Sequence, residues 1–190
     1  MSAHKDVVAI GASMGCLDAI EKVLSDFTMS MPPVVMTLHM QPGVSKLFAY
    51  QMEERYRLSV KEAENGDILK REHVYIAPHG RHMKIVRGSG GLTISLFAGE
   101  KVNFCCPSVD VLLESVASVC GKNAVGAILT GIGADGAKGL LAMRNSGAET
   151  IGQDEKTSYV YGMPKAAWDI GAVMYVLPLN KIADKIMTLV

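Results

Sequence analysis

The stretch that decides the fold is Asp6-Val7-Val8-Ala9-Ile10, which runs directly into Gly11-Ala12-Ser13-Met14-Gly15-Cys16. Its apolar part is too short for a helix and rich in branched residues, which is typical of a buried strand in a parallel sheet. The turn that follows has the spacing G-x-S-x-G, in which the glycines allow a tight strand-to-helix bend that exposes one hydroxyl. Ser13 is therefore a candidate nucleophile, although similar turns also occur in phosphate and dinucleotide sites.

Length and composition limit the class of protein. The chain has 190 residues, 49% of them hydrophobic, which suits one compact domain over residues 1–190. Its 19 basic residues balance 19 acidic ones, so the positive charge expected of a nucleic-acid or anionic-membrane binder is missing. The first six residues do not resemble a signal peptide, and no apolar run reaches membrane-spanning length. We therefore expect a cytoplasmic protein without nucleic-acid partners or membrane insertion.

Strand-like and helix-like segments alternate along most of the chain. Strands are predicted at 34–38, 123–130, 149–153 and 173–177, with helices after most of them, including 44–56 and 179–188. This alternation predicts an α/β fold, with a doubly wound, mostly parallel sheet and helices on both faces. The middle differs, because 58–62, 74–77, 84–86 and 92–96 are short strands mostly without helices between them. We expect an antiparallel excursion there, its last two strands forming a hairpin around residues 87–91.

Two more polar residues directly follow predicted strands. His39 ends the strand at 34–38, and Asp135 lies in the glycine-rich loop after 123–130. Because the carboxyl ends of parallel strands share one edge of a sheet, we expect Ser13, His39 and Asp135 to meet in one crevice. Taken alone, His39 could instead cap the end of its strand through a hydrogen bond to a loop carbonyl. Asp135 alone could be the N-cap of the helix that follows it. Together they supply a nucleophile, a base and a carboxylate that orients the base.

Other kinds of site fit the sequence less well. The histidines at 73, 79 and 82 do not form a metal pattern, because strand alternation separates His79 from His82 and no carboxylate completes the set. The four cysteines at 16, 105, 106 and 120 lack metal-ligand spacing and are expected to be reduced thiols. A dinucleotide site would need glycine where Ser13 and Cys16 stand, and an acidic residue in place of His39. The order Ser, His, Asp also differs from that of α/β-hydrolases. We expect neither a metal nor a cofactor.

Along essentially its whole length, the chain resembles the catalytic domain of CheB, the chemotaxis protein-glutamate methylesterase. The resemblance implies hydrolysis of glutamate γ-methyl esters, and deamidation of glutamines, on the cytoplasmic helical regions of methyl-accepting chemotaxis receptors. It implies Ser13 as nucleophile, His39 as general base and acid, and Asp135 as the residue that orients His39. It also implies the backbone N–H of Ile132 as an oxyanion donor. The matching stretches are Ile10-Gly11-Ala12-Ser13, His39-Met40-Gln41-Pro42-Gly43, Val60-Lys61-Glu62-Ala63-Glu64, Tyr75-Ile76-Ala77-Pro78, Arg81-His82-Met83, Pro107-Ser108-Val109-Asp110-Val111-Leu112 and Ile128-Leu129-Thr130-Gly131-Ile132-Gly133-Ala134-Asp135-Gly136.

The chain departs from this family in three respects. Met14 and Cys16 replace the threonine and last glycine of the usual G-A-S-T-G-G, which removes a hydroxyl beside the nucleophile. Cys105 and Cys106 stand where a histidine-arginine pair is common, which removes positive charge near the expected cleft and favours an altered receptor preference. The receiver domain that normally precedes the catalytic domain is not in this sequence, so a separate receiver domain is a further expected partner. The alternative function is a catalytically impaired receptor-binding module of the same fold.

Overall fold

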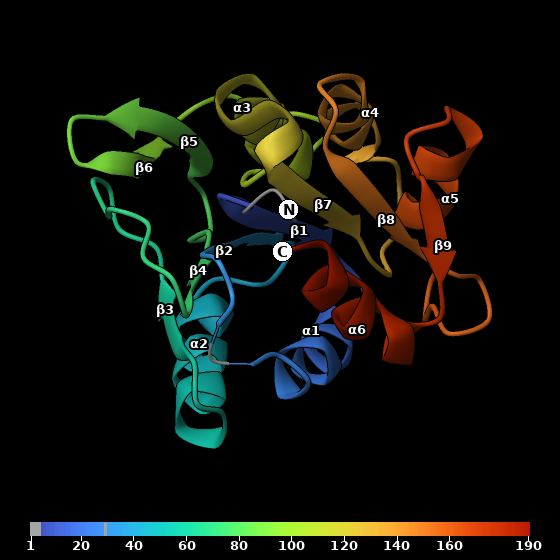
Figure 1. Ribbon diagram of the computed structural model, residues 1–190, viewed down its shortest axis with the longest axis horizontal. Helices are drawn as coiled ribbons and strands as arrows, with labels where there is room; N and C mark the ends of the chain where they lie inside the picture. Colours follow the sequence, from blue (N-terminus) through green and yellow to red (C-terminus); the bar gives the residue numbers. More distant parts are fainter. Residues whose placement is uncertain (1–4, 29) are drawn as a thin grey trace.

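A parallel sheet of seven strands forms the middle layer of the computed structural model, which describes residues 5–28 and 30–190 (Figure 1). The strand order is β3-β4-β2-β1-β7-β8-β9, and each neighbouring pair is parallel. This arrangement confirms the predicted α/β class with a mostly parallel sheet. The strands are β1 (Val7–Ala12), β2 (Val34–Leu38), β3 (Ser59–Glu62), β4 (His73–Ile76), β7 (Ala124–Ile128), β8 (Glu149–Gln153) and β9 (Tyr175–Leu177).

Helices cover both faces of the sheet, as expected for a doubly wound fold (Figure 1). Successive side chains of a strand point to opposite faces. In β1, Val8 and Ile10 therefore belong to one buried cluster, and Val7 and Ala9 to the other. Burial on both sides explains why this strand is a continuous apolar run. Helices α1 (Cys16–Ser25), α2 (Val44–Arg55) and α6 (Leu179–Leu189) lie on one face, and α3 (Val109–Cys120), α4 (Ala137–Asn145) and α5 (Met163–Asp169) on the other.

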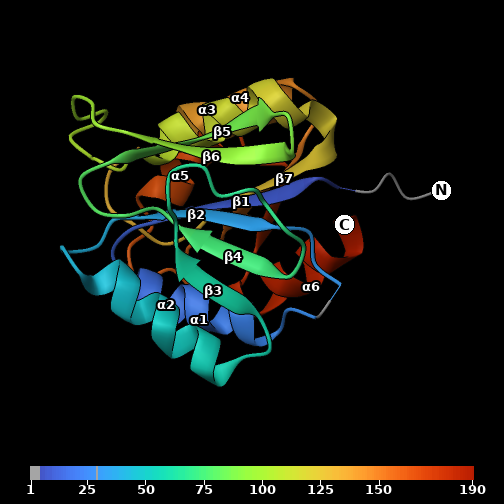
Figure 2. The ribbon, with the colours of Figure 1, turned by 90° about the vertical axis from the view of Figure 1, so that its left-hand side faces the viewer.

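The predicted hairpin forms a second, two-stranded sheet from β5 (His82–Gly88) and β6 (Gly91–Phe97). It lies on the α3 side of the main sheet, opposite α1 and α2 (Figure 2), and the Ile85 N–H donates to Ser115 Oγ of α3 at 2.9 Å. Both strands are longer than predicted, so most of the expected loop 87–91 is strand. The antiparallel excursion is therefore confirmed for the hairpin.

The other two strands of the middle region do not follow that expectation. β3 and β4 pair parallel to each other, and β4 pairs parallel to β2, so both belong to the main sheet. An irregular segment joins them in place of a helix, and it pairs with β6 through Gly66 N to Ile94 O and Ile94 N to Asp67 O, each at 2.8 Å. Because these long-range backbone bonds replace those of a crossover helix, the parallel connection has no helical signature in the sequence.

Three strands of the main sheet end side by side. The register pairs Ala12 with Leu38 and Gly11 with Ile128, so the residues after β1, β2 and β7 emerge at one edge. Two backbone bonds extend this alignment past the strands, from Ser13 N to Thr130 O at 2.9 Å and from His39 N to Ala12 O at 3.1 Å. The predicted common edge is confirmed.

No helix in the described part of the chain is long and apolar enough to cross a bilayer. The expectation about a signal peptide concerns mainly positions 1–4, which lie outside the described residues.

Candidate active site

Ser13 occupies the sharp turn between β1 and α1. Gly15 is the N-cap of α1, with a left-handed backbone at φ 82°, and the Cys16 N–H donates to Ser13 O at 2.9 Å. A Cβ at position 15 would come within 2.7 Å of Tyr159 Cβ, so this turn requires glycine for both space and backbone angle. Among the described residues, the Met14 N–H has no hydrogen-bond acceptor. The turn therefore places the Ser13 hydroxyl beside a free N–H at the positive end of a helix.

Gly131, on the loop after β7, lies directly against Ser13. A Cβ at position 131 would be 2.8 Å from Ser13 Cβ and 3.0 Å from Ser13 N, and closer still to Met163 Sδ. Such distances require the backbone of one loop to move. The position of Ser13 therefore depends on close contact between the loops that follow β1 and β7.

We expect Gly131→Ala to lower the free energy of unfolding by roughly 1–3 kcal/mol and to reduce hydrolytic turnover, because the added methyl displaces Ser13. Gly90→Ala, in the turn of the hairpin, is the matched control. Its added Cβ would meet only the end of the Ile68 side chain. Urea unfolding and ester turnover of both variants provide the measurement. Equal, small effects of the two substitutions would contradict this role for Gly131.

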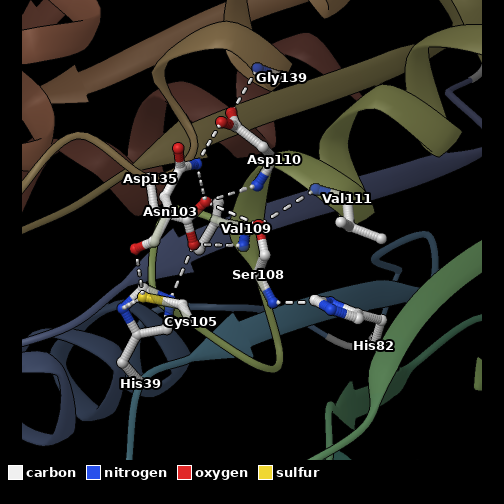
Figure 3. A network of polar contacts seen from close by, with 10 residues as sticks. All are labelled: His39, His82, Asn103, Cys105, Ser108, Val109, Asp110, Val111, Asp135 and Gly139. Carbon is white, nitrogen blue, oxygen red and sulfur yellow. Dashed lines mark hydrogen bonds and ion pairs between the residues drawn. The ribbon is translucent and has the colours of Figure 1, made fainter. Parts of the chain in front are cut away.

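His39 and Asp135 are brought together as predicted. His39 Nε2 lies 2.9 Å from Asp135 Oδ2 (Figure 3), and the Asp135 side chain is 3% exposed against 17% for His39. A carboxylate oxygen only accepts, so Nε2 carries the proton and donates it. In the neutral ring the other nitrogen, Nδ1, is then the acceptor, and Cys105 Sγ lies 3.7 Å from it. This tautomer leaves Nδ1 as the atom that can act as a base.

Asp135 accepts hydrogen bonds from several directions at once, mostly at the N-terminus of α3 (Figure 3). Its predicted alternative role, N-cap of the helix that follows it, is wrong. Gly136 is the N-cap of α4 and makes no side-chain cap bond, whereas Ser108 is the N-cap of α3. Oδ1 accepts from Ser108 Oγ at 2.7 Å, Asn103 Nδ2 at 2.8 Å and Asp110 N at 3.3 Å, and Oδ2 accepts from Val109 N at 2.7 Å as well as from His39.

This network determines the charge of Asp135. Burial alone would raise the pKa of the Asp135 carboxyl, but hydrogen bonds from His39, Asn103, Ser108 and the Val109 amide outweigh it and hold the pKa below its usual value. Asp135 is therefore ionised at neutral pH. An ionised carboxylate keeps the Nε2 proton of His39 in place and stabilises the ring when Nδ1 takes up a second proton.

Asn103 is a component of the site that the sequence analysis missed. It has a left-handed backbone at φ 51°, and its Nδ2 donates both to Asp135 and to Asp110 Oδ2, at 2.7 Å. Asp110 Oδ1 in turn accepts from the Gly139 N–H of α4 at 2.6 Å. The amide thus ties the loop before α3 to two buried carboxylates. The tolerance of asparagine for positive φ is the only local signal, and it is weak.

Ser13 and His39 share a cleft of about 430 Å³, in which Met14 is 49% exposed. A second hollow of about 540 Å³ adjoins it, and His39 lines both, with Cys105 and Cys106 on the second side. Within the described residues, the Ser13 hydroxyl makes no hydrogen bond to His39. Catalytic hydrogen bonds are often long without substrate and tighten in the complex. Ser13 and His39 therefore line one cleft without a hydrogen bond between their side chains.

The cysteines are all free thiols in the structure. Burial, and then the charge of Asp135, raises the pKa of Cys105 to about 11, so Cys105 is a protonated thiol beside Nδ1 at neutral pH. Burial likewise raises the pKa of Cys16 to about 11. Cys16 points into the core with 5% exposure. Of the two departures near Ser13, Met14 therefore alters the lining of the cleft most.

Ile132 lies in the loop between β7 and α4, with 62% of its surface exposed. Its N–H donates to no described residue, and it follows Gly131, which contacts Ser13. Its role as an oxyanion donor stays a prediction.

The histidines of the middle region each lie within hydrogen-bond distance of a different backbone carbonyl. His73 pairs with the carbonyl of Arg71, His79 with that of Met40 and His82 with that of Glu100.

Comparisons with known proteins agree with this architecture. Residues 8–186 match the family model described as CheB methylesterase. A relative from Sulfurimonas denitrificans, named protein-glutamate methylesterase/protein-glutamine glutaminase, is 49% identical over 183 residues, and one of the same name from Escherichia coli O157:H7 is 44% identical over 181. The crystal structure of the Thermotoga maritima CheB methylesterase catalytic domain superposes with a TM-score of 0.95 at 34% identity, covering 99% of this chain and 100% of that one.

The chain spans about half the length of the relatives it matches. The alignments cover 96% and 95% of this chain, but 52% of the Sulfurimonas denitrificans protein and 52% of the Escherichia coli protein.

Proposed function

Because this chain belongs to the CheB methylesterase family, we propose that it hydrolyses glutamate γ-methyl esters on methyl-accepting chemotaxis receptors and deamidates receptor glutamines. Ser13 is the nucleophile, His39 the general base and acid, and Asp135 the residue that orients His39. The single observation that carries this proposal is the 2.9 Å bond from His39 Nε2 to buried Asp135. It leaves Nδ1 as the ring nitrogen that accepts a proton, and His39 lines the same cleft as Ser13.

The reaction follows from these groups. Ser13 Oγ attacks the ester carbonyl carbon while His39 Nδ1 accepts the hydroxyl proton, and the charge develops on the former carbonyl oxygen. Free N–H groups of Met14 and Ile132 are the candidate donors to this oxygen; one such donor is typically worth about 10²–10³ in rate. His39 then protonates the departing methoxide to give methanol. Water, deprotonated by His39, then attacks the acyl carbon, the bond to Ser13 Oγ breaks, and His39 returns the proton to Oγ as the glutamate carboxylate is released.

The organisation around this domain is also part of the proposal. Residues 1–190 act as a single catalytic domain in the cytoplasm, on the helical cytoplasmic regions of the receptors. The relatives are about twice as long as this chain, which is consistent with a receiver domain as a regulatory partner. No metal or cofactor has a part in the steps above, since each is performed by Ser13, His39, Asp135, backbone N–H groups and water.

The proposed function is tested by methanol release from receptor membranes methylated on glutamate. We expect catalytic release with this chain and only background release with buffer, and ammonia release when the receptor carries glutamine at the same sites. Co-sedimentation with the same membranes measures binding in parallel. Receptor binding without methanol release would reject the hydrolase and favour the impaired binding module.

A further inference from the structure

The described residues contain one cluster of histidine, cysteine and acidic side chains close enough to hold a metal ion, His39, Cys105 and Asp135. The potential ligand atoms lie within 4.8 Å of one another. The cluster contains none of the three histidines of the middle region, at 73, 79 and 82. It includes Cys105, which has no role in the proposed reaction. We propose that Cys105 Sγ and His39 Nδ1 form a site for a thiophilic divalent cation such as Zn²⁺, and that this cation blocks the base.

The distance between the two ligand atoms suits a metal. Zinc binds a thiolate at about 2.3 Å and an imidazole nitrogen at about 2.0–2.1 Å, so tetrahedral geometry separates the two atoms by about 3.6 Å. Cys105 Sγ and His39 Nδ1 are 3.7 Å apart. A cation can therefore enter between them with little movement of either side chain.

The hydrogen bond on the far side of the ring favours the same site. Histidines that bind metals usually donate their other N–H to a carboxylate, which fixes the tautomer and strengthens the ligand. His39 already donates Nε2–H to Asp135. Both oxygens of Asp135 accept other hydrogen bonds in the protein, so we assign it the supporting role and leave Cys105 and His39 as ligands.

The site also has room for further ligands of the cation, and the thiol proton of Cys105 has an acceptor. The hollow of about 540 Å³ beside both ligands leaves the other coordination positions open to water. Binding breaks the S–H bond of Cys105 and forms an Sγ–metal bond, and the proton passes to the solvent buffer. Nδ1 of His39 forms the second bond through a lone pair that carries no proton. While the cation is bound, Nδ1 cannot accept the Ser13 proton.

Metal binding is measured on the whole chain, without an activity assay. Zn²⁺ affinity is obtained by competition with a chromogenic chelator, and Cd²⁺ is titrated to follow the ultraviolet thiolate-to-cadmium absorption. We expect one ion per chain, and a dissociation constant raised tenfold or more by Cys105→Ser and by His39→Gln. Cys106→Ser is the matched control and should keep the wild-type affinity, because Cys106 is the adjacent thiol in the same hollow.

Several results would overturn the site. One is the absence of a thiolate-to-cadmium band in the wild-type chain. Another is a Cys105→Ser variant that binds Zn²⁺ as tightly as the wild type. The third is a Cys106→Ser variant that loses as much affinity as Cys105→Ser. Circular dichroism of each variant separates loss of a ligand from loss of the fold.

The inhibitory consequence rests on the proposed function and is measured separately. Methanol release of each protein is compared with and without Zn²⁺, so that every variant serves as its own reference. We expect strong inhibition of the wild type and of Cys106→Ser, and at least tenfold weaker sensitivity in Cys105→Ser. Binding without inhibition would overturn the block of His39, whereas a chain that binds Zn²⁺ but never releases methanol would reject the proposed function and leave the site intact.

Discussion

Replacing Ser13 by alanine is expected to reduce methanol release by roughly 10⁴- to 10⁶-fold, the range seen when serine hydrolases lose their nucleophile. The reason is chemical, because no other side-chain hydroxyl of the residues that the structure describes lines the cleft beside His39. The fold should be almost unaffected, since the Ser13 hydroxyl has no side-chain hydrogen-bond partner among the described residues. We therefore expect the free energy of unfolding to change by less than about 1 kcal/mol. Single-turnover methanol release and urea unfolding measure the two effects.

Two controls accompany this variant, one on helix α1, which follows Ser13, and one at the thiol beside His39. Ser25→Ala removes an exposed hydroxyl at the other end of α1 and should leave methanol release unchanged. Cys105→Ala tests a different nucleophile, because Cys105 Sγ is the group that lies against Nδ1. Near-normal release by Ser13→Ala together with its loss in Cys105→Ala would transfer the nucleophilic role to the thiol. The raised pKa of Cys105 argues against that result, since the thiol is protonated at neutral pH.

The edge of the sheet that carries these residues could be predicted because its signals are local. Buried parallel strands are continuous apolar runs, and β1 and β2 appear as such runs that end at Ser13 and His39. The parallel arrangement alone then places the residues after these strands at one edge. Asp135 could be included for the same reason, since it follows β7. What each residue does in the reaction remains a prediction for mutagenesis.

The support of Asp135 could not be predicted, because it comes from contacts distant in the sequence. The local pattern at Asp135 indicates the N-cap of α4, yet the carboxylate lies at the N-terminus of α3. Which of two neighbouring helices it reaches depends on how α3 and α4 pack. The same is true of Asn103, whose positive φ is held by bonds to two carboxylates. The parallel pairing of β3 and β4 was missed because backbone bonds to the hairpin replace a crossover helix.

Asp135→Asn is expected to lower kcat by about 10⁴-fold, as when the acid of a serine protease triad is replaced by an amide. The amide has a single acceptor oxygen, whereas both carboxylate oxygens of Asp135 accept hydrogen bonds. Its NH₂ group would face donors, and the favoured tautomer of His39 would change. The buried unsatisfied donors should also lower the free energy of unfolding by roughly 3 kcal/mol. Ester kinetics and urea unfolding at neutral pH provide the measurement.

Asp110→Asn separates positioning of His39 from general damage to the loop. Asp110 accepts from Asn103 and from the Gly139 N–H but makes no bond to His39. We expect it to destabilise the fold by a comparable amount while kcat falls far less than in Asp135→Asn. Equal losses of kcat in the two variants would mean that Asp135 acts only through the stability of the loop.

The pH dependence of stability tests the charge of Asp135 independently of catalysis. The folded-state pKa of Asp135 is depressed, so its stabilising contribution is complete above the unfolded pKa of about 3.9 and is lost as the pH falls towards the folded value. The difference in unfolding free energy between wild type and Asp135→Asn should therefore be largest near neutral pH and shrink below about pH 4. A difference that stays constant on acidification would show that Asp135 stabilises the fold by shape and not by its charge.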